Sequence, residues 1–221
     1  MASDTDRQDS DTRVAGFLLV AAFLTTLILF AYHPAEGAAA NFAAILRNEA
    51  KDAPTDAVVH GGFIAVMTIE LVCFARLAML LGLRRMLPLA GLIFTAAGFA
   101  VLSASMVLDG FVAPAIAKRF VGATAGLEAA HTLYIFCGTA IGFLMPIGLL
   151  FQASGIGAWS FALAFRPAYA RAVGLLGISL AGLLVVGIAA GRGNPLVLMA
   201  GLLATAVWAL AVGILLAARK A

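Results

Sequence analysis

Two histidines in this sequence each follow a carboxylate by one helical turn. Asp56 lies four residues before His60, and Glu128 lies three residues before His131. Residues three or four apart are neighbours on one face of a helix. Imidazole and carboxylate together form the usual ligand set of zinc, iron and copper. The two pairs therefore predict a metal site if the fold brings them together.

Two more such residues, His33 and Asp109, close apolar runs at the same predicted depth. In one form of the metal hypothesis, His60 and His131 hold a haem between facing helices. In the other, the histidines and carboxylates bind a bare transition-metal ion, with a carboxylate fixing the tautomer of a ligating imidazole. The alternatives are ordinary solvated helix ends or a proton or ion pathway. The candidate ligands are His33, His60, His131, Asp109, Glu128 and Asp56.

Glu70 is the other residue that predicts chemistry, because it lies within the apolar stretch 64–80. A carboxylate at that depth costs on the order of 3 kcal/mol on insertion scales, so it marks function by default. It predicts either a proton or substrate site, or a protonated side chain bonded to a neighbouring hydroxyl.

The elements that must position these residues are six long apolar runs. A bilayer core about 30 Å thick is crossed by roughly 20 helical residues. Apolar residues make up 63% of the chain and charged residues 11%, whereas a soluble domain carries about a quarter charged residues. The sequence therefore predicts an all-α, multi-pass membrane protein with six transmembrane helices. The predicted spans are Val14–Tyr32, Ala57–Leu81, Met86–Leu108, Ala130–Phe151, Val173–Ala190 and Pro195–Ala217.

The connections predict topology and domain organisation. Eight Lys and Arg residues fall on the side of the N-terminus and five on the other, which predicts cytoplasmic termini in a bacterial inner membrane. Residues 1–13 are expected to form a disordered cytoplasmic tail, followed by one membrane domain over 14–221. Short amphipathic helices in the interface are expected within 38–51 and 110–126. Trp159, in the inner connection 155–167, is expected at headgroup depth.

Small residues predict close helix packing, with Gly138 and Gly142 in the fourth span and Gly174 and Gly177 in the fifth. Three functional classes stay open. One is a metal- or haem-binding membrane protein, the second a proton-coupled or small-solute transporter using Glu70, and the third a non-catalytic subunit or scaffold. Beyond the lipid bilayer, the expected partner is a second copy or another membrane subunit. The net charge of +3 reflects the loops and predicts no nucleic-acid partner.

Overall fold

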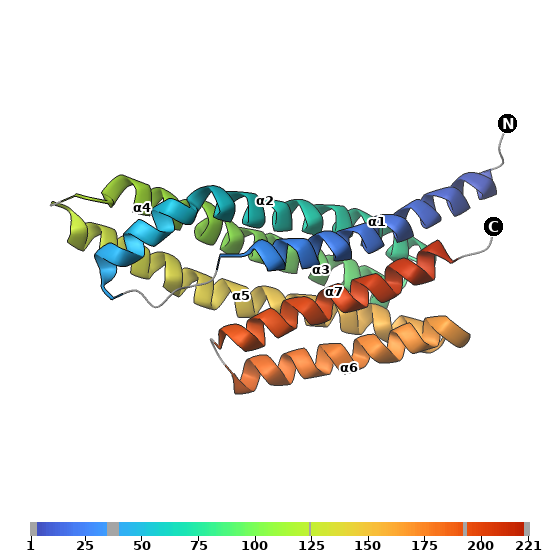
Figure 1. Ribbon diagram of the computed structural model, residues 1–221. Helices are drawn as coiled ribbons and strands as arrows, with labels where there is room; N and C mark the ends of the chain where they lie inside the picture. The colour runs from blue at the N-terminus through green and yellow to red at the C-terminus, as the bar shows by residue number, and fades with distance from the viewer. Residues whose placement is uncertain (1–3, 35–39, 124, 192–193, 219–221) are drawn as a thin grey trace.

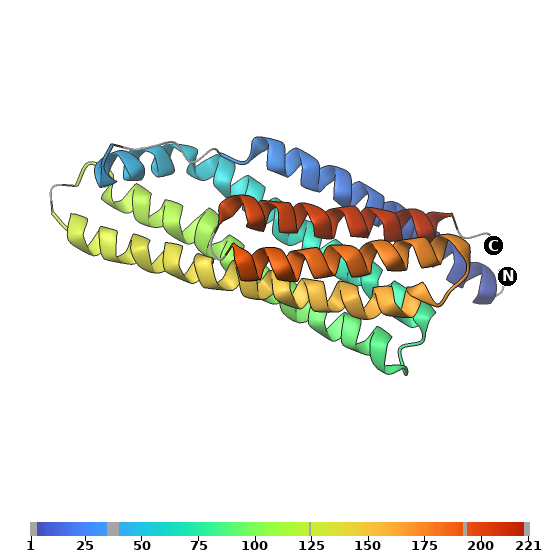
Figure 2. The same cartoon turned by 90° about the horizontal axis from the view of Figure 1, so that it is seen from below.

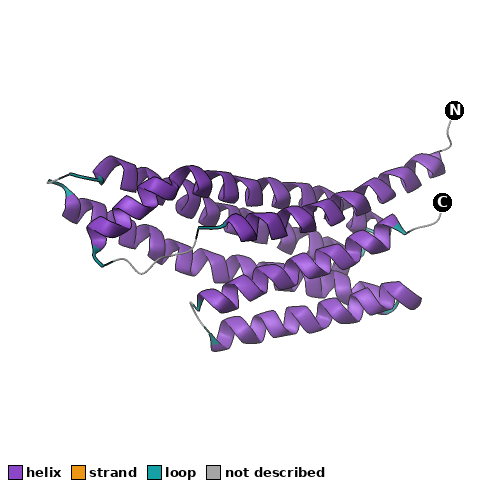
Figure 3. Cartoon of the chain, viewed as in Figure 1, coloured by secondary structure: helices purple, strands orange, loops and turns teal. Residues whose placement is uncertain are grey.

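The computed structural model describes residues 4–34, 40–123, 125–191 and 194–218, and all its regular structure there is helical (Figure 3). Six helical stretches are long and apolar enough to cross a membrane, which confirms the predicted all-α, multi-pass architecture. The elements are α1 (Asp4–Tyr32), α2 (Phe42–Leu81), α3 (Met86–Val107), the π-helix η1 (Leu108–Val112), α4 (Ala113–Phe120), α5 (Leu127–Ala164), α6 (Ala168–Ala190) and α7 (Pro195–Ala217).

Three of the six stretches are much longer than a bilayer requires. The 40 residues of α2 extend for about 60 Å, twice the thickness of a bilayer core. Figures 1 and 2 show that the start of α2, α4 and the start of α5 project beyond the end of α1. The start of α1 and the end of α7 lie together at the opposite end of the bundle (Figure 1).

The projecting part replaces the short interfacial helices that the sequence predicted. Residues 42–51 are the first turns of α2, and Gly110 lies in η1, which joins α3 to α4 without a break. Residues 38 and 39 and residue 124 of those segments lie outside the described residues. The predicted interfacial segments are therefore extensions of long helices, each with its backbone hydrogen bonds continued from the span.

The centre of the bundle is an aromatic cluster. Trp159 of α5 and Trp208 of α7 stack with their ring centroids 5.9 Å apart, and Phe74 of α2 packs against both rings. Trp159 also donates a hydrogen bond from Nε1 to the carbonyl of Pro88, at 3.1 Å. Trp159 is fully buried inside the bundle, because α5 continues to Ala164 instead of ending near residue 151. Its place at headgroup depth stays a prediction.

Glycines allow the helices around this cluster to approach one another closely. A Cβ at Gly155 of α5 would lie 3.1 Å from the carbonyl oxygen of Gly91 in α3, and a Cβ at Gly174 of α6 would overlap the backbone of α5. Such contacts are the usual basis of helix association in membranes. Gly138 and Gly142 face open space instead, so the described residues do not pack closely against them.

The first turns of α1 are helical where the sequence predicted a disordered tail; residues 1–3 lie outside the described residues. Arg76 of α2 explains the difference. Its guanidinium donates to the Thr12 hydroxyl at 2.9 and 3.0 Å and also to the carbonyl of Gln8. These bonds attach the polar start of α1 to the bundle and give the half-buried Arg76 three hydrogen bonds to two acceptor atoms.

Replacing Arg76 should release this segment. In Arg76→Met, we expect faster hydrogen–deuterium exchange at residues 8–13, because hydrogen bonds to a charged donor stabilise by about 1.5–3 kcal/mol. Mass spectrometry of the detergent-purified protein measures the exchange. Arg84→Met, at an exposed arginine, is the matched control and should exchange like the native chain. Equal protection in the two variants would contradict the role of Arg76.

Candidate metal-binding site

Asp109 is positioned by a local widening of its helix. Pro114 has no N–H, and its ring crowds the carbonyl four residues earlier, which belongs to Gly110. The helix responds by forming the π-turn η1, in which the N–H of Ala113 donates to the carbonyl of Leu108 instead of to Asp109. Such π-turns occur frequently at functional sites. This one places the Asp109 carboxylate beside α2.

His60 of α2 meets that carboxylate with a defined ring orientation. Its Nδ1 lies 2.9 Å from the carbonyl oxygen of Asp56, which can only accept, so Nδ1 carries a proton. Its Nε2 lies 3.1 Å from Oδ2 of Asp109. In the neutral ring, Nε2 holds a lone pair that faces a carboxylate. Two acceptors at this distance require a proton or a cation between them.

His33, just after the end of α1, completes the group. Its Nδ1 lies 3.0 Å from the carbonyl oxygen of Pro34, so the same tautomer argument leaves the Nε2 lone pair available. The rings of His33 and His60 meet edge to face, with centroids 5.1 Å apart. Ligand atoms of His33, His60 and Asp109 all lie within 4.8 Å of one another. The structure therefore brings these three predicted residues together.

The site is buried on one side and open on the other. The His60 side chain is 3% exposed and that of Asp109 is 40% exposed. The buried Asp56 adds a second carboxylate that interacts electrostatically with both histidines and with Asp109. The arrangement thus offers imidazole nitrogens and carboxylate oxygens to a cation, with a route from solvent on the side of Asp109.

His131 and Glu128 lie elsewhere. The ring of His131 packs edge to face on Phe42, the first residue of α2, with centroids 4.7 Å apart. Phe42 and His60 are 18 residues apart on one continuous helix, which corresponds to about 27 Å. Glu128 is exposed in the first turn of α5. The structure therefore does not bring His60 and His131 to one haem or one ion.

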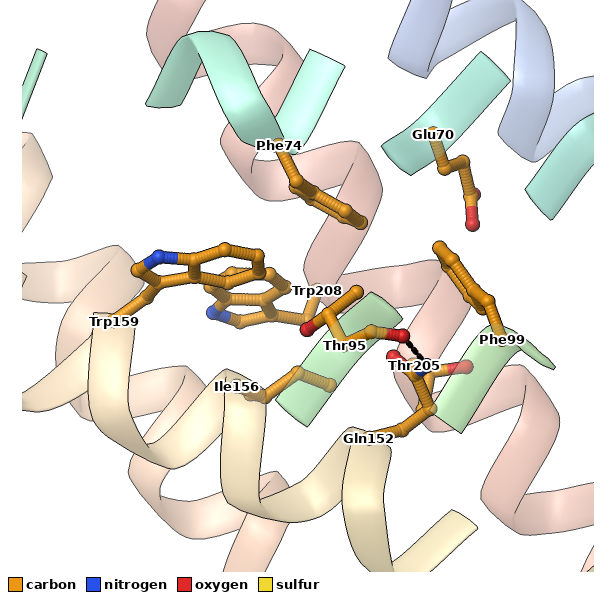
Figure 4. A pocket seen from close by; sticks show the side chains of 9 residues that line it. All are labelled: Glu70, Phe74, Thr95, Phe99, Gln152, Ile156, Trp159, Thr205 and Trp208. Atoms are coloured by element: carbon orange, nitrogen blue, oxygen red, sulfur yellow. Dashed lines mark hydrogen bonds between the residues drawn. The ribbon is translucent and has the colours of Figure 1, made fainter. Parts of the chain in front are cut away.

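Glu70 lies in a separate place, buried between α2, α3, α5 and α7 (Figure 4). On α2, the buried residues Phe63 and Met67 lie between His60 and Glu70 on the same face. These two apolar side chains separate the histidine–Asp109 group from the carboxyl group of Glu70. The predicted metal and proton residues therefore belong to two distinct sites.

The sequence alone did not predict the feature that brings His33, His60 and Asp109 together. Gly110 lies against His60 so closely that a Cβ there would overlap the imidazole. The spacing Asp109-Gly110-Pro114 contains the signal, because a proline four residues after a glycine within an apolar helix predicts an opened turn. Gly110 then allows η1 to approach the histidine.

The fold and these residues together define a polytopic α-helical membrane protein with an imidazole–carboxylate cluster where α1 ends. Comparisons of the chain with protein-family models, curated proteins and solved structures find no match. The function is therefore argued from the geometry of the chain itself.

Filling the space at Gly110 should destabilise the protein. In Gly110→Ala, the new methyl group meets the His60 side chain, and overpacking of this kind costs about 1–3 kcal/mol. Gly138→Ala is the matched control, since nothing lies within 4 Å of that position and alanine favours a helix by up to about 1 kcal/mol. Thermal unfolding in detergent should show a lower midpoint for Gly110→Ala only. Equal midpoints would contradict the close contact.

Proposed function

We propose that this protein binds a divalent first-row transition-metal ion through His33, His60 and Asp109 at the end of α1. One observation carries the proposal. Both histidines direct Nδ1 to a backbone carbonyl, and one ring nitrogen of each lies within 4.8 Å of a carboxylate oxygen of Asp109. Metal-ligating histidines usually hold their other ring nitrogen in this way, because the hydrogen bond fixes both the tautomer and the ring orientation.

The composition of the cluster supports an ion more than a simple ion pair. A proton shared between His60 and Asp109 would satisfy those two groups, but it would give His33 no role. An ion held by His33, His60 and Asp109 uses all three side chains, and Asp56 contributes the backbone carbonyl that orients His60.

Two imidazoles and one carboxylate suit zinc or ferrous iron. Three protein ligands leave a coordination position for water or a small ligand, whereas structural zinc sites are closed by four. Asp109 supplies the exposed side of the site. The geometry therefore favours an ion that exchanges or binds a further molecule over one that only stabilises the fold.

The cellular setting belongs to the same proposal. The excess of Lys and Arg on the side of the termini supports a bacterial inner membrane with cytoplasmic termini. The cluster lies at the opposite end of the span and would then face the outside of the cell. An association with a second copy or another membrane subunit stays a prediction.

The ligands can be tested by metal binding. We expect the detergent-purified protein, stripped with a chelator, to take up one equivalent of Zn²⁺ in a calorimetric titration. His33→Ala, His60→Ala and Asp109→Ala should each weaken binding by at least about 100-fold, since even supporting residues contribute 10- to 100-fold. His131→Ala is the matched control and should bind like the native chain. Elemental analysis of the unstripped protein identifies the native ion.

Two results would contradict the proposal. One is the absence of stoichiometric uptake of Zn²⁺, Fe²⁺ or Mn²⁺ by a protein that unfolds cooperatively. The other is equal loss of binding in His60→Ala and His131→Ala, because those residues lie at different ends of the α2 extension.

A further inference from the structure

The second buried polar site surrounds Glu70. Four helices line a small cavity there, and side chains from each of them face it (Figure 4). Glu70 is 8% exposed although it is a carboxylic acid. The lining residues are Glu70 and Phe74 of α2, Thr95 and Phe99 of α3, Gln152, Ile156 and Trp159 of α5, and Thr205 and Trp208 of α7. We call this space the Glu70 chamber.

The chamber lies near the middle of the membrane span. Glu70 is ten residues from His60 at one end of the span and eleven from Leu81 at the other. At 1.5 Å per residue, each distance is about 15 Å along the helix axis, half of a bilayer core. Water from either side must therefore pass through the packed bundle to reach the carboxyl.

Within the described residues, Glu70 has no hydrogen-bond or salt-bridge partner. The neighbouring amide of Gln152 is already used, because its Nε2 donates to the carbonyl of Thr95 at 3.0 Å. The Thr205 hydroxyl donates to the carbonyl of Leu202 at 2.8 Å. The Thr95 hydroxyl and the Nε1–H of Trp208 are buried without a partner among the described residues. Buried polar groups are normally satisfied, so these two groups and the Glu70 carboxyl, all beside one cavity, indicate a small polar occupant.

The size of the chamber selects that occupant. The space open to the centre of a water molecule there is about 10 Å³, which is about what one water requires. An organic substrate does not fit between the packed rings of Phe74, Trp159 and Trp208. A single water fits, and it can bring a proton to the carboxyl and accept one from it.

The surroundings hold no charge that would keep Glu70 ionised. The lining residues from α3, α5 and α7 are all uncharged. On α2, Cys73 interacts electrostatically with Glu70, and Arg76 is directed to Thr12 and Gln8 of α1. The stretches 14–30 of α1 and 173–190 of α6 contain no Asp, Glu, His, Lys or Arg.

We infer that the Glu70 chamber is an intramembrane proton-binding site, in which Glu70 exchanges one proton with a single buried water. The protonated carboxyl is neutral, and release leaves a carboxylate and a hydronium ion that departs through the bundle. This site is independent of the proposed metal site at His33, His60 and Asp109, because Phe63 and Met67 lie between the two. Loss of metal binding therefore leaves this inference intact, and the reverse also holds.

The two tryptophans of the chain both line the chamber, and Glu70 is the carboxyl group among its lining residues, so their fluorescence reports on the surroundings of Glu70. We expect tryptophan emission of the full chain in nanodiscs to shift reversibly with pH, following a single proton. Glu70→Gln should abolish the shift. Glu128→Gln is the matched control at an exposed glutamate and should keep it. Glu70→Asp retains a carboxyl and should keep a displaced transition, which covers the case in which Glu70→Gln fails to fold.

Infrared difference spectra provide the chemical assignment. A protonated carboxyl band that shifts in D₂O, decreases as pH rises and is missing only in Glu70→Gln supports the inference. A band that persists unchanged to the alkaline limit of folding would overturn it, because Glu70 would then be a permanently neutral packing residue. An emission shift that survives in folded Glu70→Gln would also overturn it.

Discussion

A buried backbone N–H or C=O must find a hydrogen-bond partner, and in a helical bundle the helix itself supplies it. Pro114 has no N–H to contribute, and the chain forms a π-turn there instead of an open loop. The turn keeps the backbone bonded and changes the direction of Asp109. Gly110 then lets the widened helix lie against His60. The missing N–H of Pro114 thus explains the π-turn, and the π-turn brings Asp109 to His33 and His60. These are the only three side chains grouped closely enough to bind a metal among the described residues.

The same constraint shapes the rest of the bundle. Helices that bond their own backbones associate by packing against one another. Glycines allow two helices to approach closely, and tryptophan rings fill the wider spaces. Gly155 brings α5 against α3, and Trp159, stacked on Trp208, packs against α3 one turn further along. The Glu70 chamber is the space that neither the close helix contacts nor the tryptophan rings fill. A polar cavity therefore arises beside closely packed helices.

Hydropathy alone predicted the six spans, the buried position of Glu70 and the common depth of His33, His60 and Asp109. Hydropathy did not predict the position of His131. The start of an apolar run marks the membrane surface only if the helix begins there, and α5 begins well beyond the end of α1. Apolar residues in that projection look like membrane residues in the sequence. The contact of His131 with Phe42, and the approach of η1 to α2, depend on tertiary packing, which no spacing in one helix encodes.

The central position of Glu70 has an electrical consequence. In an energised membrane, a full crossing by one charge is worth about 2.3 kcal/mol per 100 mV, so a proton that reaches this depth gains or loses about 1.2 kcal/mol. Occupancy of the carboxyl would then follow the voltage as well as the acidity of the two compartments. The surface cluster near His33 sits outside most of that field and would be nearly indifferent to it. A single chain would thus hold one site that senses the potential and another that does not.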